Sequence, residues 1–94
     1  MSTPRQHLGE ALWRLSDLVR ADERSRSFRA KAYRRAVWSL DDLAPDLSDP
    51  SEKALSIPGI GTGVWRLIQE FRENGTLERL ERLEQLYPAE SAKI

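Results

Sequence analysis

The chain has 94 residues, with 15 basic side chains, 15 acidic side chains and no cysteine. This length suits a single domain over 1–94 with a modest core, and the lack of cysteine excludes disulfides and thiolate metal sites. No apolar run approaches the about 18 residues that span a bilayer, and the polar start does not look like a secretory signal. We therefore expect a cytoplasmic protein without a membrane partner.

The net charge of zero conceals an uneven distribution of charge. Residues 1–40 carry nine basic and four acidic side chains, whereas residues 41–94 carry six basic and eleven acidic ones. The segment from Arg24 to Arg35 has six basic residues and no acidic one. Neutral composition therefore does not exclude a polyanionic partner, because what matters is whether positive charge gathers on one face.

Apolar residues recur at three- and four-residue steps, which predicts an all-α fold, a compact bundle of four to five short helices. The first helix is expected over about 6–21, with an apolar stripe from Leu8 to Val19. Ser27 is a candidate N-cap for a second helix that ends before Pro45. Its expected core face is Phe28, Ala32, Ala36, Leu40 and Leu43, and its opposite side carries Arg29, Arg34 and Arg35.

Two more helices are expected around a glycine-rich turn. Ser51 can cap a short helix that ends at Ser56, and a longer helix follows the turn over roughly 62–73. Asn74 and Gly75 should stop that helix, because both residues tolerate positive φ.

The last helix is expected over 76–86. Its leucines should point inward (Leu77, Leu80, Leu83, Leu86). We expect ordered structure over about 6–87 and a frayed tail over 88–94. Helical spacing also favours the core or its margin for Trp13 and Trp38.

The turn between the two middle helices, Ile57-Pro58-Gly59-Ile60-Gly61-Thr62-Gly63, has the pattern of a helix-hairpin-helix. Its glycines allow tight backbone geometry, and the N–H groups that open the next helix lack intrahelical partners. Such donors at the positive end of a helix dipole suit a phosphate. The side chain of Ile60 is expected to plug the turn against the core. We predict backbone-binding residues at Gly59, Ile60, Gly61, Thr62, Gly63 and, one turn later, Arg66.

Three stretches resemble the amino-terminal helix-hairpin-helix domain of X-family DNA polymerases, of the DNA polymerase beta type. The first is Phe28–Ala36 and the second is Leu55–Gly63. The third consists of two short segments, Ile68–Phe71 and Gly75–Leu77. Together the resemblance spans roughly residues 8–87. The resemblance implies a stand-alone domain that binds single-stranded, gapped or nicked DNA near a 5′-phosphate. It also implies a role in DNA repair with a protein partner, at the nucleoid if the protein is bacterial.

The same resemblance implies two binding features. Arg29 and Tyr33 match positions that approach the 5′-phosphate, and Arg79 falls near another basic position. With the neighbouring charges, the expected basic patch is Arg29, Lys31, Tyr33, Arg34, Arg35 and Arg79. The backbone carbonyls of Leu55, Ile57 and Ile60 could hold Na⁺ or K⁺, and no other cofactor is expected.

The domain in that family is often a lyase, whose chemistry needs a lysine amine that forms a Schiff base with a sugar aldehyde. The position of that lysine is Leu67 here, and a neighbouring basic position is Gly63. Arginine cannot replace the amine, because arginine stays protonated. We therefore expect a DNA-binding module that is not an enzyme and has no catalytic residue.

Two alternatives remain open from the sequence. The acidic second half and Trp65 would suit a protein–protein interaction module on the same scaffold, since a fold does not determine a function. A residual abasic-site lyase could use Lys31 in place of the missing lysine.

Overall fold

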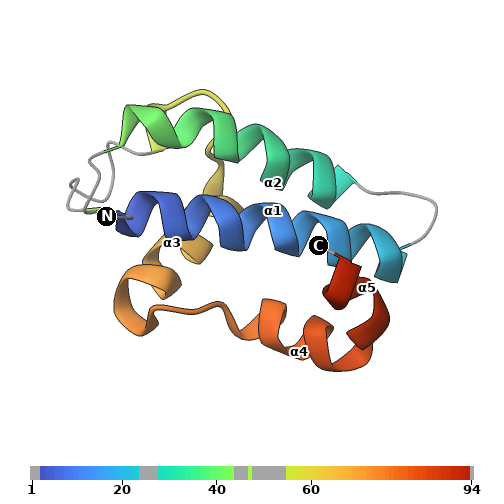
Figure 1. Cartoon of the computed structure of the whole chain (residues 1–94). Helices are drawn as coiled ribbons and strands as arrows, with labels where there is room; N and C mark the ends of the chain where they lie inside the picture. The colour runs from blue at the N-terminus through green and yellow to red at the C-terminus, as the bar shows by residue number, and fades with distance from the viewer. Residues whose placement is uncertain (1–2, 24–27, 44–46, 48–54, 94) are drawn as a thin grey trace.

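The computed structural model describes residues 3–23, 28–43, 47 and 55–93, and these residues form helices and no strand (Figure 1). The elements are α1 (Pro4–Glu23), α2 (Phe28–Ser39), the 3₁₀ turn η1 (Leu40–Asp42), α3 (Thr62–Asn74), α4 (Glu78–Leu86) and α5 (Pro88–Lys93). The predicted all-α class is confirmed. The positions of Ser27, Pro45 and Ser51 lie outside the described residues. Among the helices described, none has the length and apolar character to cross a bilayer.

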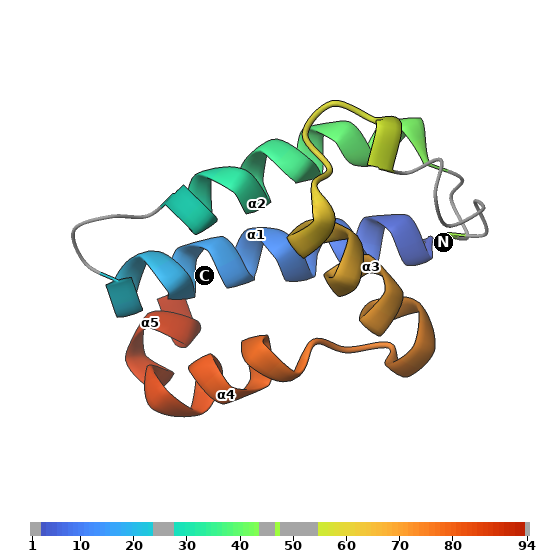
Figure 2. The ribbon, with the colours of Figure 1, turned by 180° about the vertical axis from the view of Figure 1, so that it is seen from behind.

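Helix α1 is the central element of the fold. It lies between α2 and α4 in both views (Figures 1 and 2), runs antiparallel to α2 and also contacts α5. Of its predicted stripe, Ala11 is partly buried and the other side chains are fully buried (Leu8, Leu12, Leu15, Leu18, Val19). Because each such burial stabilises the fold by about 1.5–3 kcal/mol, this helix supplies much of the hydrophobic stabilisation.

Helix α2 packs on α1 with only part of the face that we expected, since Ala36 and the following Leu40 and Leu43 are buried as predicted but the start of the helix is rotated. Ala30, Tyr33 and Ala36 are buried, whereas three residues expected in or beside the core are exposed (Phe28, Ala32, Trp38). The sequence of α2 contains two overlapping apolar stripes, and periodicity alone does not distinguish between them. The observed rotation turns the aromatic side chains at both ends of α2 toward the surface.

Gly75 ends α3 as predicted. It has φ of 73°, in the left-handed region, and its N–H donates to the Phe71 carbonyl at 2.8 Å. The next helix, α4, begins after Leu77, and its leucines are buried as expected with one exception. Leu86 is 63% exposed, because α4 ends there and the chain turns into α5.

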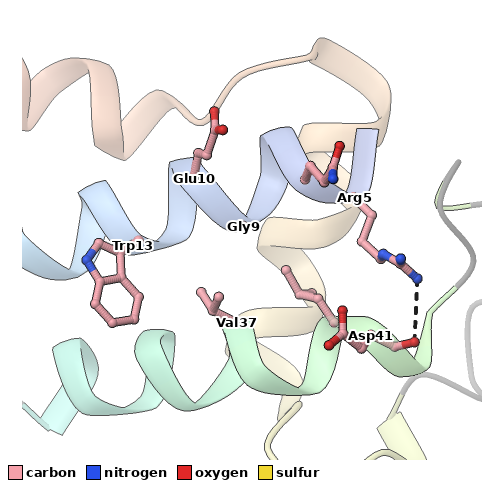
Figure 3. Close-up of a pocket in the computed structure, with 8 residues that line it drawn as sticks. Arg5, Gly9, Glu10, Trp13, Val37 and Asp41 are labelled. Carbon is pink, nitrogen blue, oxygen red and sulfur yellow. Dashed lines mark hydrogen bonds between the residues drawn. The ribbon is translucent and has the colours of Figure 1, made fainter. Parts of the chain in front are cut away.

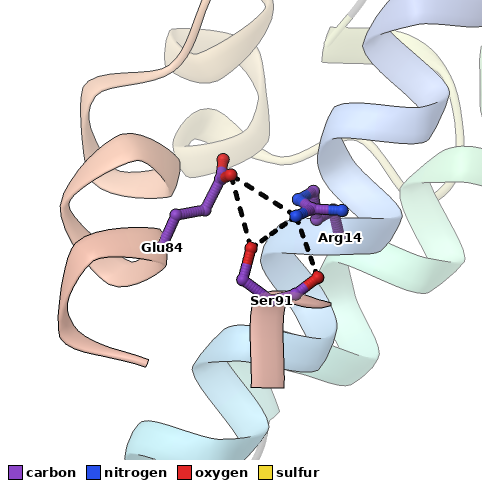
Figure 4. Close-up of polar contacts among 3 residues, drawn as sticks. All are labelled: Arg14, Glu84 and Ser91. Carbon is purple, nitrogen blue, oxygen red and sulfur yellow. Dashed lines mark hydrogen bonds and ion pairs between the residues drawn. The ribbon is translucent and has the colours of Figure 1, made fainter. Parts of the chain in front are cut away.

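The expected frayed tail is wrong for residues 88–93, which form α5. Polar contacts hold this short helix against α1 (Figure 4). The Arg14 guanidinium donates to the Ser91 carbonyl at 3.0 Å, bonds to the Ser91 hydroxyl and pairs with Glu84 at 3.4 Å. The Tyr87 hydroxyl also donates to Asp22 at 2.8 Å. Sequence periodicity missed α5 because these contacts join residues far apart in the chain.

Candidate nucleic-acid interface

The hairpin turn joins a helical turn at Leu55–Ser56 to α3. Within it, the Ile60 N–H donates to the Ile57 carbonyl at 3.1 Å, and Gly59 has φ of 95°. The Ile60 side chain is 3% exposed and belongs to the hydrophobic core. It therefore holds the turn against the core in the way we expected.

The turn lies directly against the carboxyl-terminal end of α2. The Ser39 hydroxyl donates to the Pro58 carbonyl at 2.5 Å, and a Cβ added to Gly59 would lie 2.5 Å from the Ser39 Oγ. Only glycine combines this close approach with the positive φ. Ser39 therefore positions the hairpin. The sequence did not identify it, because nothing local marks a contact between residues 19 apart.

The start of α3 presents backbone donors. Gly61 is the N-cap, with extended φ and ψ of −92° and −177°, and it makes no side-chain cap hydrogen bond in the part of the chain that the structure describes. The first helical hydrogen bond runs from Trp65 N–H to the Gly61 carbonyl at 2.9 Å. The N–H groups of the three intervening residues thus precede the helical ladder and lie at the positive end of the dipole.

Gly61 and Gly63 both face open space. A Cβ added to either residue would meet no atom within 4 Å. Neither has a positive φ, which among the glycines is found at Gly59 and Gly75. Nothing within the described protein therefore requires glycine at these positions. A close approach by a ligand would require it.

Beside these donors, a groove of about 620 Å³ separates the hairpin from α2. Its walls are formed by Phe28, Lys31, Ala32 and Arg35 of α2 and by residues 55–61 of the hairpin. Both basic side chains are exposed, and α2 contains no acidic residue. The structure thus brings two of the predicted basic residues next to the predicted backbone donors.

The other predicted basic residues are distributed differently. Arg66 is exposed on α3 about one turn beyond Thr62, and Arg29 is exposed near the start of α2. Arg79 belongs to α4, which packs against α1 on the side away from α2 (Figure 1). The structure therefore separates Arg79 from the basic patch, with the width of α1 between them.

Arg34 does not belong to the groove. Its guanidinium pairs with Asp17, donates to the Ser16 hydroxyl at 2.9 Å and lies 4.6 Å from the centroid of the Trp13 ring. The prediction that it shares a surface with Arg35 is wrong, because the rotation of α2 turns Arg34 toward α1.

The rotation of α2 also turns Tyr33 toward the core. It is 9% exposed and packs in the core cluster, so it presents little surface to a phosphate. Leu67, which the resemblance described above aligns with a lyase lysine, is partly buried and packs against the core.

A second groove, of about 530 Å³, lies between α1 and α2 (Figure 3). Arg5 lies at one end, where its guanidinium donates to the Leu43 carbonyl at 2.7 Å. Glu10 and Asp41 also line this groove, and their carboxylates make it less suited to a polyanion. No group of three or more metal-binding side chains (His, Cys, Asp or Glu) is found among the described residues.

Comparison with known proteins agrees with the hairpin geometry. A model of the helix-hairpin-helix domain matches residues 3–77, from α1 through α3. Neither the search of curated proteins nor that of solved structures gave a match. Helix-hairpin-helix domains commonly bind DNA without sequence preference, which supports a general DNA-binding role. The match covers well over half of the chain, and the chain therefore belongs to the helix-hairpin-helix domain family.

Proposed function

We propose that this protein binds the sugar-phosphate backbone of DNA without sequence preference, at gaps or nicks that carry a 5′-phosphate, and without lyase activity. The observation that carries the proposal is the pair of open glycines. Gly61 and Gly63 face empty space beside backbone N–H groups that no side chain of the described residues caps. A backbone phosphate fits this combination, because it needs both donors and room for the adjoining sugars.

The charge for such binding would come from neighbouring side chains. The N–H donors are neutral, whereas Lys31 and Arg35 line the groove under the hairpin and Arg66 follows on α3. A phosphate at the start of α3 would leave the next phosphates of the strand within reach of these cations. Arg29 is also exposed, near the start of α2, and stays among the proposed phosphate contacts.

The resemblance to the polymerase beta type supplies the finer part of the proposal. It favours a 5′-phosphate end as the ligand and a repair protein as a partner. The hairpin carbonyls of Leu55, Ile57 and Ile60 are the proposed ligands for Na⁺ or K⁺. The Ile57 carbonyl accepts one hydrogen bond, from Ile60 N–H at 3.1 Å, and a carbonyl oxygen has a second lone pair for a cation.

A salt titration with gapped, 5′-phosphorylated DNA tests the proposal. With three to five phosphate contacts, the plot of log affinity against log salt should have a slope of about −3 to −4, and the dissociation constant should be on the order of micromolar or weaker. Fluorescence anisotropy measures both quantities. The same gap without the 5′-phosphate is the matched control and should bind more weakly. Absence of binding at low salt would contradict DNA binding, and equal affinity for the two gaps would contradict the 5′-phosphate preference.

Borohydride trapping on DNA with an incised abasic site tests the absence of lyase activity. We expect no covalent adduct, because the lysine position of the family is the apolar Leu67. Lys31 lines the groove and is the residue through which a residual lyase would act. An adduct that forms with the natural protein and disappears in Lys31→Ala would establish the lyase in place of the proposed non-enzymatic module.

A further inference from the structure

An exposed stripe runs along α2, and we call it the α2 stripe. It consists of Phe28, Lys31, Arg35 and Trp38, whose spacing of three, four and three residues places them on one side of the helix. All four are exposed, with the aromatic residues at the two ends and the cations between them. The first three residues line the groove under the hairpin, and Trp38 continues the stripe beyond it.

Among the described residues, no packing contact accounts for the tryptophan at position 38, Trp38. It is 76% exposed, although tryptophan is highly buried on average. Trp13 differs, since the Arg34 guanidinium lies 4.6 Å from its ring centroid and it is only 38% exposed. Trp38 therefore presents to solvent a large aromatic face beside Arg35.

We propose that Trp38 stacks on an unpaired base of bound DNA, one step beyond the hairpin groove. The inference rests on the proposed function. The charge beside Trp38 selects this ligand over an apolar protein surface, because the α2 stripe carries Lys31 and Arg35 and α2 has no acidic residue. Four helical residues rise about 6 Å, so Lys31 and Arg35 are separated by roughly the step between neighbouring phosphates of an extended strand.

Stacking on Trp38 requires bases that are not already stacked in a duplex. Every base has a π-face, so an aromatic platform beside a basic groove binds single strands with little sequence preference. A strand whose phosphates contact Lys31 and Arg35 would turn a base toward the ring of Trp38. This subsite thus favours the unpaired part of a gapped substrate.

Acidic residues mark where the proposed path ends. Asp41 and Asp42 of η1 lie about one turn beyond Trp38 and are exposed, so they repel a phosphate there. The strand would therefore lie between the hairpin groove and Trp38 and leave the surface of α2 before it reaches η1. Trp38 becomes the last contact on α2.

The test compares two labelled strands of equal length, an oligothymidylate and an abasic oligomer that has phosphates but no bases. Trp38→Ala should lower the affinity of the full chain for the oligothymidylate about tenfold and leave the affinity for the abasic oligomer unchanged. Trp38→Phe should restore most of the loss, because phenylalanine keeps a ring. Leu86→Ala removes another exposed apolar side chain, 63% exposed on α4, and should change neither affinity.

The outcomes separate this inference from the proposed function. An equal loss on both strands, or no loss on either, would overturn stacking by Trp38 while leaving backbone binding intact. Binding of neither strand by the natural protein would overturn the proposed function as well. Circular dichroism of Trp38→Ala should match that of the natural protein, since Trp38 does not belong to the core cluster formed by the described residues.

Discussion

Gly63→Ala should leave the protein folded and up to about 1 kcal/mol more stable, because alanine is a better helix former than glycine. The added Cβ meets no protein atom within 4 Å. In the same variant, the affinity for gapped DNA should fall about tenfold or more. The methyl group would occupy the space of the sugar-phosphate backbone, and hydrogen bonds to a charged phosphate contribute about 1.5–3 kcal/mol each. Urea unfolding and anisotropy titration measure the two effects.

Gly9→Ala is the matched control for this variant. Gly9 lies inside α1, where an added Cβ would make ordinary contacts with Leu40 at 3.6 Å and Val37 at 3.9 Å. It should raise stability by a similar amount and leave DNA affinity unchanged. The diagnostic result is that Gly63→Ala raises the stability of the protein and lowers its affinity for DNA. Unchanged DNA affinity in that variant would remove the main support for the backbone contact at the start of α3.

Gly59→Ala should be the most damaging of the glycine substitutions. A residue with a side chain at φ of 95° costs about 1–2 kcal/mol, and the Cβ would lie 2.5 Å from the Ser39 Oγ. Displacement of that hydroxyl also loses its hydrogen bond to Pro58, at about 0.5–1.5 kcal/mol. We expect a loss of about 2–3 kcal/mol in the free energy of unfolding and weaker DNA binding, because the hairpin moves away from α2.

A double-mutant cycle with Ser39→Ala separates the two causes. Removal of the hydroxyl should cost about 1 kcal/mol alone, but it also relieves the contact that Gly59→Ala creates. The double variant should therefore be about 1 kcal/mol more stable than the sum of the single effects predicts. Strictly additive losses would mean that the Ser39 hydroxyl does not clash with the added Cβ, and that the cost at Gly59 comes from its backbone conformation alone.

The features of the fold that sequence could predict are those set by neighbouring residues. The periodicity of α1, the stop at Gly75 and the plug at Ile60 all follow from local patterns. The rotation of α2 could not be predicted, because two apolar stripes compete on that helix and packing against α1 decides between them. The docking of α5 depends on Arg14, which contacts a residue 77 positions away.

In the candidate site, too, the features set by neighbouring residues could be predicted from sequence, and those set by packing could not. The glycine turn could be identified from sequence, since the spacing of glycine and proline is a local signal. Sequence could not sort the basic residues, because Arg34 and Arg35 are neighbours in the chain but lie on different surfaces. Arg34 pairs with Asp17 and lies over the ring of Trp13, whereas Arg35 lines the groove. The rotation of one helix determines which cations remain available to a ligand.

The position of α2 also gives this neutral protein an electric dipole. Of the described helices, α2 alone has more basic than acidic residues, and it lies on one side of α1 with α4 on the other (Figures 1 and 2). In the field of a polyanion such a molecule experiences a torque even though its net charge is zero. It would turn the hairpin side toward DNA before contact, so the fraction of encounters that are productive should be high at low salt and fall as ions screen the field.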